Sequence, residues 1–141
     1  MLGKLTAITR SGANAAGVYA AATRSYVYDG YERLCKTIEP ETGATLQRLD
    51  AANNVSWRAP GLNLTSATCD PGSVPLAARI SFGYDNMNRL LSTNYGDGSA
   101  AITRDYWPDG QPKTVTSSGA VWTMNYNSRR LPTTQSLGFE G

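Results

Sequence analysis

The sequence contains the phrase Tyr84-Asp85-Asn86-Met87-Asn88-Arg89-Leu90, and nearly the same phrase stands earlier as Tyr28-Asp29-Gly30-Tyr31-Glu32-Arg33-Leu34. Three other stretches keep the frame with substitutions: Leu49-Asp50-Ala51-Ala52-Asn53-Asn54-Val55, Tyr106-Trp107-Pro108-Asp109-Gly110 and Tyr126-Asn127-Ser128-Arg129-Arg130-Leu131. The five copies begin at residues 28, 49, 84, 106 and 126, so they recur about every 21 residues with one gap of 35. A fixed period of this length is typical of repeat proteins, whose units stack on their neighbours. The sequence therefore predicts an array whose function lies in its shape rather than in a catalytic cluster.

The residues before each phrase alternate as they do in a β-strand. Ile80, Phe82 and Tyr84 share one side of a period-two pattern. Residues 102–106 and 122–126 show the same alternation, and their Tyr, Ile, Thr and Trp side chains suit a pleated, half-buried surface. We expect each of these stretches to be the first strand of a repeat unit.

The phrase itself carries the residues of a turn, because Asp or Asn is followed by Gly or Asn. A second strand is expected to follow it, at residues 34–38, 90–95 and 112–116, and a second turn at residues 42–43, 96–98 and 118–119. Each unit is then a β-hairpin of about 20 residues, with tips near 29–32, 51–54, 85–88 and 108–110. The predicted fold class is all-β, with repeated hairpins forming one continuous antiparallel sheet strip.

Two regions fall outside this regular pattern. Residues 1–23 are expected to form a leading strand or loop before the array of residues 24–141, and the Ala-rich stretch 13–22 lacks the amphipathic stripe of a helix. Residues 60–75 are rich in Pro and Gly and form an insertion between the second and third units. We expect a long surface loop that the fold tolerates rather than one with a function of its own.

Composition argues against several function classes. The net charge is only +2, with no basic stripe, so a nucleic-acid partner is not expected. The chain has no His, which removes the commonest general base and metal ligand, and we expect no enzyme activity, cofactor or metal. The longest apolar run, 15–22, is too short to span a bilayer, and no apolar segment of a signal peptide follows Lys4.

The two cysteines, Cys35 and Cys69, are too few for a thiolate zinc site in a chain without His. Cys69 lies in the insertion, which could fold back on the first unit, so the pair could form a disulfide. They could equally be two small buried residues, the usual role of a free cysteine. Sequence leaves both interpretations open.

The phrase Tyr-Asp-x-x-x-Arg-Leu at this period resembles the RHS or YD repeat of bacterial Rhs proteins, toxin-complex components and animal teneurins. The resemblance covers residues 24–137, rests on the copies at Tyr28 and Tyr84, and is strengthened by the stretch 33–43. It implies a β-strip that coils into a hollow shell around a toxic C-terminal domain, which type VI secretion or a related machine delivers. It does not extend to the family's autoproteolytic motif, because Asp70-Pro71-Gly72-Ser73 has different neighbours and is read as a turn.

On this resemblance the chain is a non-catalytic segment of an encapsulating Rhs-type shell. Its implied partners are the other repeats, the enclosed toxin, a secretion spike and a chaperone, and its implied location is bacterial, secreted or at the cell surface. The alternative is a module at the cell surface that binds carbohydrate or another protein. Longer repeat context with downstream toxin and immunity genes would favour the shell, and a lone secreted reading frame would favour the binder.

We expect the residues of the repeat motif to be structural. The recurrence of Asp29, Asp50, Asp85 and Asp109 once per period is typical of equivalent turns rather than of a cleft. Arginines in the motif are expected to be solvated cations at strand edges, and the tyrosines to pack against one another along one face rather than stack on sugar rings. The full motif set is Tyr28, Asp29, Arg33, Leu34, Leu49, Asp50, Tyr84, Asp85, Arg89, Leu90, Tyr106, Asp109, Gly110, Tyr126, Asn127 and Leu131.

The last unit carries Val121, Trp122, Met124 and Leu131, with no polar cap after it in the sequence. Repeat arrays normally protect such a unit with a polar outer face. We expect the chain to associate as its concentration rises, because uncovered apolar side chains and unpaired strand edges favour contact between copies.

Overall fold

The computed structural model describes residues 3–13, 17 and 19–139 of the 141-residue chain. Its described residues form one sheet of 11 strands in the order β1 to β11, and each strand pairs antiparallel with its neighbour in sequence. The all-β fold predicted from the repeats is confirmed. The strands are β1 (Ala7–Ala13), β2 (Tyr19–Tyr28), β3 (Leu34–Glu39), β4 (Gly43–Leu49), β5 (Val55–Leu62), β6 (Ile80–Tyr84), β7 (Leu90–Tyr95), β8 (Ile102–Tyr106), β9 (Pro112–Ser117), β10 (Ala120–Tyr126) and β11 (Pro132–Phe139).

The hairpin tips fall where the repeat phrase predicts them. The loops between β2 and β3, β4 and β5, β6 and β7, and β8 and β9 contain the four predicted tips. The second turns are also in place, with positive φ at Gly43, Gly98, Ser118 and Gly119. The Ala-rich stretch is partly strand, because β1 ends at Ala13 and β2 begins at Tyr19, while residues 14–16 and 18 lie outside the described part. Strand β2 runs without a break through residues 23 and 24.

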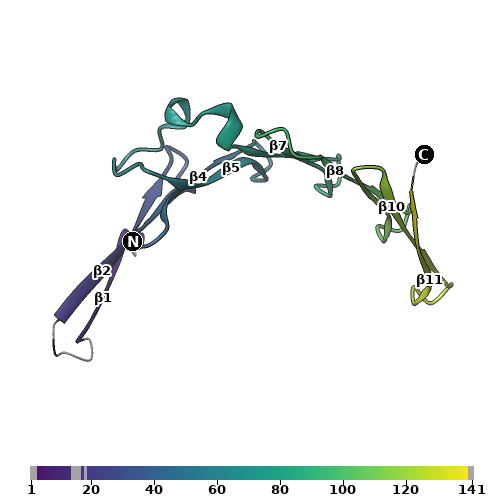
Figure 1. Cartoon of the computed structure of the whole chain (residues 1–141), viewed down its shortest axis with the longest axis horizontal. Helices are drawn as coiled ribbons and strands as arrows, with labels where there is room; N and C mark the ends of the chain where they lie inside the picture. The colour runs from purple at the N-terminus through teal and green to yellow at the C-terminus, as the bar shows by residue number, and fades with distance from the viewer. Residues whose placement is uncertain (1–2, 14–16, 18, 140–141) are drawn as a thin grey trace.

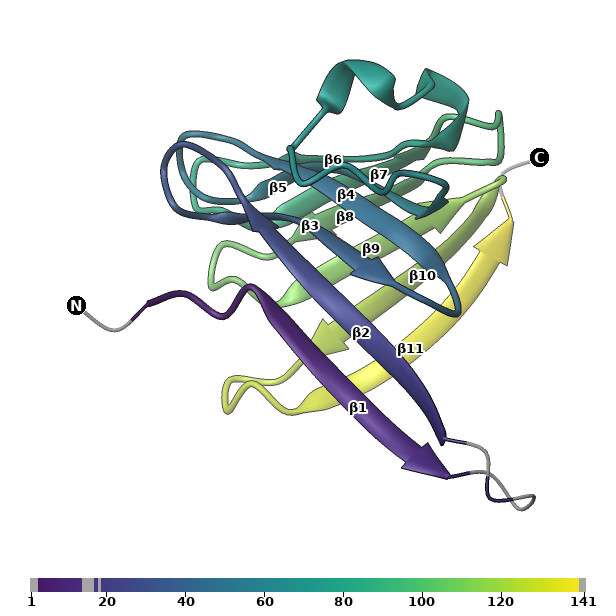
Figure 2. The same ribbon diagram turned by 90° about the vertical axis from the view of Figure 1, so that its left-hand side faces the viewer.

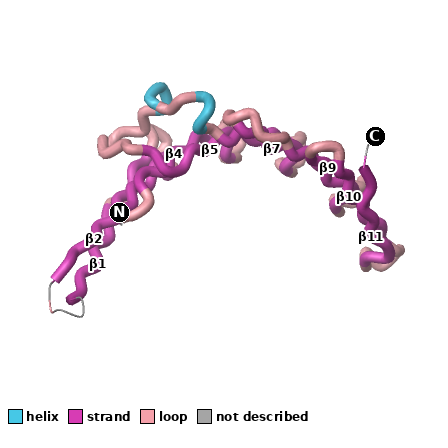
Figure 3. Tube along the Cα trace, in the orientation of Figure 1, coloured by secondary structure: helices cyan, strands magenta, loops and turns pink. Residues whose placement is uncertain are grey.

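The sheet is a long curved strip with a convex and a concave side (Figure 1). The strands lie side by side in chain order. The view turned by 90° shows the insertion standing off one face of the sheet (Figure 2). The insertion, residues 63–79, contains two short 3-10 helices, η1 (Pro71–Ser73) and η2 (Leu76–Ala78), which lie on the convex side (Figure 3). The helices of the described structure are confined to this segment.

The apolar side of the sheet changes face between β5 and β6. In β4 and β5, Leu46 pairs with Ala59 on the convex face, and Trp57 shares that face because it lies two residues from Ala59. Trp57 pairs with Ser81 in β6, and the same face continues through polar pairs such as Ser92 with Thr103 in β7 and β8. The convex face is therefore apolar over β4 and β5 and mainly polar over β6–β9.

The concave face shows the opposite pattern. Arg58 of β5 pairs with Ile80 of β6, so the concave face changes from polar in β5 to apolar in β6 at this pair. Further along, Val115 pairs with Trp122, and Trp122 pairs with Leu137. The concave side of β6–β11 is rich in apolar side chains: Ile80, Phe82, Ile102, Val115, Trp122, Met124, Leu137 and Phe139.

The insertion covers the apolar part of the convex face. Val74 of the insertion is 3% exposed and packs with Leu46, Trp57 and Ala59 in the buried cluster of the described structure. The insertion begins and ends later than the predicted residues 60–75, because β5 continues to Leu62 and β6 begins only at Ile80. Its interpretation as a merely tolerated surface loop is wrong, since it removes this apolar surface from water.

Candidate functional site

The five hairpin loops of the repeat share one backbone geometry. In the third, the Asp85 N–H donates to the Arg89 carbonyl at 3.0 Å, and the Asn88 N–H donates to the Asp85 carbonyl at 3.0 Å. The corresponding bonds occur in the other four loops. This is the three-residue hairpin loop with a left-handed last residue and an adjacent bulge. The left-handed positions are Glu32, Asn53, Asn88, Gly110 and Arg130.

The first residue of the loop uses its side chain to fix the turn. Asp85 Oδ1 accepts hydrogen bonds from the N–H groups of Met87 (2.8 Å) and Arg89 (2.9 Å), while Oδ2 accepts from Arg89 Nε (2.6 Å). Asp29 makes the same set, and Asp50 and Asn127 accept the two backbone bonds. These bonds favour the carboxylate, so the pKa values of Asp29 and Asp85 lie below the ordinary value, with the backbone N–H of Arg33 or Arg89 as the largest cause.

Asp109 does not occupy the position of the other three acidic residues. Trp107 follows the tyrosine in the fourth copy, and its indole Nε1 donates to the Met124 carbonyl at 3.1 Å. Asp109 lies later in the loop, where it accepts from the Gln111 N–H at 3.2 Å and pairs with Arg130 at 3.7 Å. The prediction of four equivalent aspartates is therefore wrong for Asp109, because Trp107-Pro108 replaces the usual start of the turn.

The two repeat arginines are not solvated edge cations. Their side chains are only 24% exposed at Arg33 and 27% at Arg89, and each is paired with the aspartate of its own loop. Arg33 also donates from Nη1 to the Asp50 carbonyl of the next loop at 2.8 Å. A guanidinium has several donors in a fixed fork, so it can serve both loops at once.

Side chains of the residue directly after the left-handed position connect consecutive loops along one edge of the strip. We call these four connections the turn ladder. Amide side chains make two of them, and sequence reasoning missed these because it followed residue type rather than hydrogen-bonding capacity. The donors and acceptors are Arg33 to the Asp50 carbonyl at 2.8 Å, Asn54 to Asn88 Oδ1 at 2.8 Å, Arg89 to the Trp107 carbonyl at 3.5 Å, and Gln111 to the Arg130 carbonyl at 3.0 Å. Leu131 occupies this position in the fifth copy.

The repeat tyrosines occupy equivalent places, each half-buried at a bulge. The hydroxyl of Tyr84 donates to the Val55 carbonyl at 3.1 Å, and that of Tyr106 donates to the Leu90 carbonyl at 2.9 Å. Both acceptors are the first residue of the second strand of the preceding unit. Tyr126 differs, because its hydroxyl contacts Met124 Sδ at 3.8 Å. Tyr84 and Tyr106 therefore hold successive units together.

The remaining motif residues have backbone roles. Leu34 begins β3, and its carbonyl accepts from Gln47 Nε2 at 2.9 Å. Leu49 takes the tyrosine position in the second copy and lies at the bulge of β4. Gly110 supplies the left-handed residue of the fourth loop at φ 90°, a conformation that glycine adopts without steric cost.

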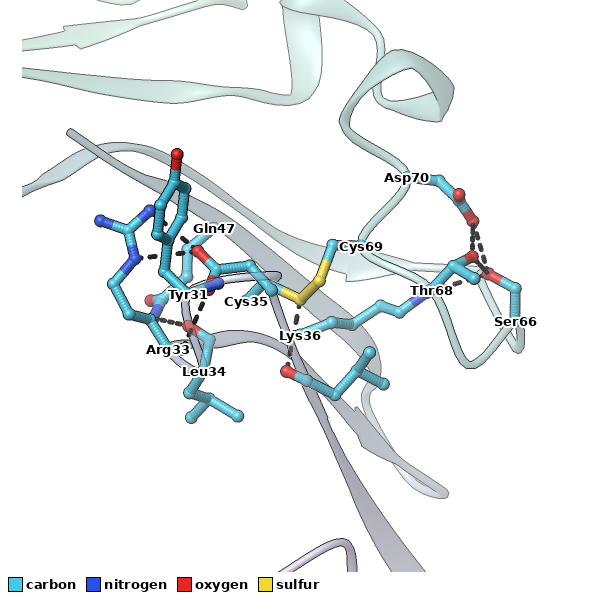
Figure 4. The surroundings of a disulfide bond; sticks show 12 residues. Tyr31, Arg33, Leu34, Cys35, Lys36, Gln47, Ser66, Thr68, Cys69 and Asp70 are labelled. Atoms are coloured by element: carbon cyan, nitrogen blue, oxygen red, sulfur yellow. Dashed lines mark hydrogen bonds and ion pairs between the residues drawn. A yellow bond between two sulfur atoms is a disulfide. The ribbon is translucent and has the colours of Figure 1, made fainter. Parts of the chain in front are cut away.

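Cys35 and Cys69 are joined by a disulfide that ties the insertion to β3, with their Cα atoms 5.8 Å apart (Figure 4). Cys35 is 3% exposed, whereas Cys69 is half-buried. Both cysteines border an open groove of about 1240 Å³ between the first two repeat loops and the insertion. The groove is lined in part by Asp29, Arg33 and Asp50, whose polar groups already bond to one another.

Lys36 lies beside the disulfide and is 1% exposed. Its Nζ is 3.0 Å from Ser66 Oγ, and Ser66 Oγ is 2.7 Å from Asp70 Oδ2, which also accepts from Thr68 at 2.6 Å (Figure 4). The hydroxyls of Thr68 and Ser66, and more weakly the Lys36 charge, lower the pKa of Asp70. Nothing in the alternation of Cys35-Lys36-Thr37-Ile38 indicates a buried lysine, because the insertion that covers it lies far along the chain.

The concave apolar face is left uncovered by the residues that the structure describes. Trp122 is 46% exposed, Leu137 64% and Phe139 78%. Arg104 lies among these residues and donates from Nη1 to Thr93 Oγ1 at 3.0 Å. A surface of this kind, rimmed by polar loops, is typical of an interaction site.

The described residues contain no group of three or more His, Cys, Asp or Glu side chains placed to hold a metal ion. Within the same part of the chain, no helix is long and apolar enough to cross a membrane. The acidic side chains of the repeat are spread along the turn ladder, one loop at a time.

No protein-family profile matches the chain, and no curated protein matches it in sequence. In fold, it is similar to a chain of the crystal structure of TcdB2-TccC3-Cdc42, with a TM-score of 0.72 and 12% sequence identity. The alignment covers 99% of this chain and 7% of the other. The chain thus spans a small fraction of that chain's length, and at this identity the likeness concerns the fold alone.

Proposed function

We propose that this chain is a non-catalytic wall segment of an Rhs-type shell that encloses a toxic polypeptide for delivery between bacteria. The observation that carries the proposal is the apolar concave face of β6–β11, where Trp122 and Leu137 lie exposed on the inner side of a curved strip (Figure 1). A wall whose inner side is apolar can hold a polypeptide by burying its apolar surface. The resemblance of the repeat phrase and the fold likeness to the TcdB2-TccC3-Cdc42 chain support the same proposal.

The repeat supplies the continuity that such a wall needs. Every strand is hydrogen-bonded to the next, and the turn ladder and the tyrosine hydroxyls add side-chain links between units. The Cys35–Cys69 disulfide supports an oxidising, secreted location. Other repeats, the enclosed domain and a delivery apparatus such as a type VI spike with its chaperone are the proposed partners. The carbohydrate-binding alternative has less support, because the Arg89 guanidinium lies over the Tyr106 ring, 4.7 Å from its centroid, and the hydroxyls of Tyr84 and Tyr106 are bonded within the array.

Site-specific photo-crosslinking in the intact gene product tests the proposal. A photoreactive phenylalanine analogue replaces Phe82 on the concave face or, as the matched control, Thr116 on the convex face. We expect position 82 to crosslink to an enclosed polypeptide, identified by mass spectrometry, and position 116 to give no such product. Equal crosslinking from both positions, or none from position 82, contradicts a wall function.

A further inference from the structure

The insertion is attached to the convex face in two parts. Its second part, residues 71–79, is held by buried Val74 and by Arg79, whose guanidinium lies 4.4 Å from the centroid of the Trp57 ring in β5. Arg79 also donates to the carbonyls of Pro71 (2.9 Å) and Val74 (2.7 Å), which braces this part internally. Its first part includes residues 65–70, which we call the flap. Residues 65–68 of the flap are exposed, and none of the six residues belongs to the buried cluster.

The flap has two links to the sheet. One is the disulfide from Cys69 to Cys35, and the other is the contact between Ser66 and the Nζ of Lys36. A buried ammonium requires polar partners, and the flap supplies them through Ser66 and Asp70. Water supplies equivalent partners once the flap is lifted, so this polar link adds little to flap closure. The disulfide is therefore the link that decides whether the flap stays closed.

We propose that the Cys35–Cys69 disulfide is a redox-operated latch, and that its reduction lifts the flap and exposes the Lys36 amine. The reductant is a dithiol. One of its thiolates attacks the half-buried Cys69 sulfur, breaks the bond to Cys35 and forms a mixed disulfide; its second thiol then displaces Cys69. The dithiol leaves as a disulfide, having given two electrons, and both cysteines end as thiols.

The geometry around the latch permits this reaction. Both cysteines line the open groove beside the first two loops, which gives a small dithiol a path to the sulfur atoms. The bond joins residues that are 34 positions apart, so its loss returns the flap to the conformational freedom of a long surface loop. Val74 and Arg79 still hold residues 71–79, so the opening is confined to the flap. The inference does not depend on what the concave face encloses.

Two measurements on the full chain test the latch. Hydrogen exchange is followed with and without dithiothreitol, and acetylation of Lys36 is compared between the oxidised chain and the Cys35→Ala/Cys69→Ala variant. We expect the exchange protection of β3–β9 to survive reduction, because the hydrogen-bonded pairing of these strands does not involve the flap. We expect Lys36 to react about tenfold faster or more in the variant, because a buried amine reacts only through local opening. Lys113, whose side chain is 40% exposed, is the internal control and should react at the same rate in both.

Two results would overturn the inference. An unchanged Lys36 reaction rate would show that the Ser66 contact closes the flap without the disulfide. Loss of protection throughout β3–β9 on reduction would show that the disulfide supports the whole sheet rather than a flap. The cysteine-free variant should not respond to dithiothreitol, which separates reduction of this bond from other effects of the reagent.

Discussion

A single side chain, the aspartate or asparagine that follows the repeat Tyr or Leu, fixes most of the geometry of four of the five loops. At Asp85, one carboxylate oxygen binds two backbone N–H groups and the other binds the Arg89 guanidinium. Such local bonds compete well with water because the groups are adjacent in the chain and little entropy is lost on joining them. The Asp85 side chain is 17% exposed, so its partners are poorly solvated if it is removed.

We predict that Asp85→Ala lowers the melting temperature clearly more than Asp109→Ala does. The first substitution leaves two loop N–H groups and a half-buried guanidinium without their acceptor. The second removes a 3.2 Å bond and a 3.7 Å ion pair at a more exposed position. Thermal unfolding followed by circular dichroism measures both, and equal losses would contradict the asymmetry between the two loops.

Stability should also depend on these carboxylates at acid pH. The pKa values of Asp29 and Asp85 are lower in the folded chain than the ordinary value of 3.8. Their contribution is therefore complete above about pH 4 and is lost as the pH falls through the lowered folded values. Asp29→Asn/Asp85→Asn keeps the backbone acceptors, as Asn127 does, but removes the titration. Urea unfolding between pH 2 and 7 should show that the free energy of unfolding falls less at acid pH in this variant than in the parent chain. An identical pH profile of the two proteins would contradict the lowered pKa values of Asp29 and Asp85.

The repeat tyrosines allow a second residue-level prediction. Tyr84→Phe should lower the free energy of unfolding by about 1 kcal/mol, the usual worth of a single hydrogen bond, because the Val55 carbonyl loses its hydroxyl donor. Tyr126→Phe is the matched control and should change it by less than about 0.5 kcal/mol, since its hydroxyl contacts only a thioether at 3.8 Å. Denaturant titration at neutral pH measures both, and a larger effect at Tyr126 would contradict the inter-unit role of Tyr84.

At the scale of elements, the hairpins could be predicted from sequence, but the cover of the convex face could not. Each hairpin depends on residues within about 20 positions, so turn residues such as Asp85 and Asn88 reveal it locally. The position of the apolar face depends instead on the register of β5 against β6, where Trp57 pairs with Ser81 across the whole insertion. No local pattern encodes that register, and the insertion therefore looked like a dispensable loop.

Distance along the chain also explains why the sequence did not reveal the buried Lys36 of the candidate site. Lys36 follows the buried Cys35 and appears as an ordinary polar residue of a strand, since its partner Ser66 lies 30 residues away. Asn54 and Gln111 were missed because they continue the turn ladder with an amide in place of a guanidinium. A search for any side-chain donor at the fifth position after the repeat Tyr or Leu would have found both.

The insertion should contribute to stability through Val74. We predict that Val74→Ala lowers the free energy of unfolding by about 2 kcal/mol, because it removes apolar surface packed against Leu46, Trp57 and Ala59. Leu76→Ala, two residues away and 75% exposed, should change it by less than about 0.5 kcal/mol. Urea titration with the disulfide intact measures both. A Val74 effect no larger than that of Leu76 would contradict burial by the insertion.

At the scale of the whole molecule, the apolar face of the strip changes sides along its length. The convex face is apolar where the insertion covers it, and the concave face is apolar over β6–β11, where Trp122, Leu137 and Phe139 remain exposed. A sheet with one apolar face needs a second layer against that face. The described residues supply this layer for β4 and β5 but not for the concave side. We therefore expect the uncovered surface to meet another polypeptide, or a second copy of the chain when no partner is present.

The isolated chain should therefore associate through its concave face. Sedimentation velocity should show a weight-average coefficient that rises with protein concentration, because contact between copies removes Trp122, Leu137 and Phe139 from water. The Trp122→Ser/Leu137→Ser/Phe139→Ser variant should stay monomeric over the same range. Thr103→Ser/Thr116→Ser on the convex face is the control and should associate like the parent chain. Equal association of all three proteins would instead indicate pairing of exposed strand edges, which uses backbone groups and is insensitive to the side chains of either face.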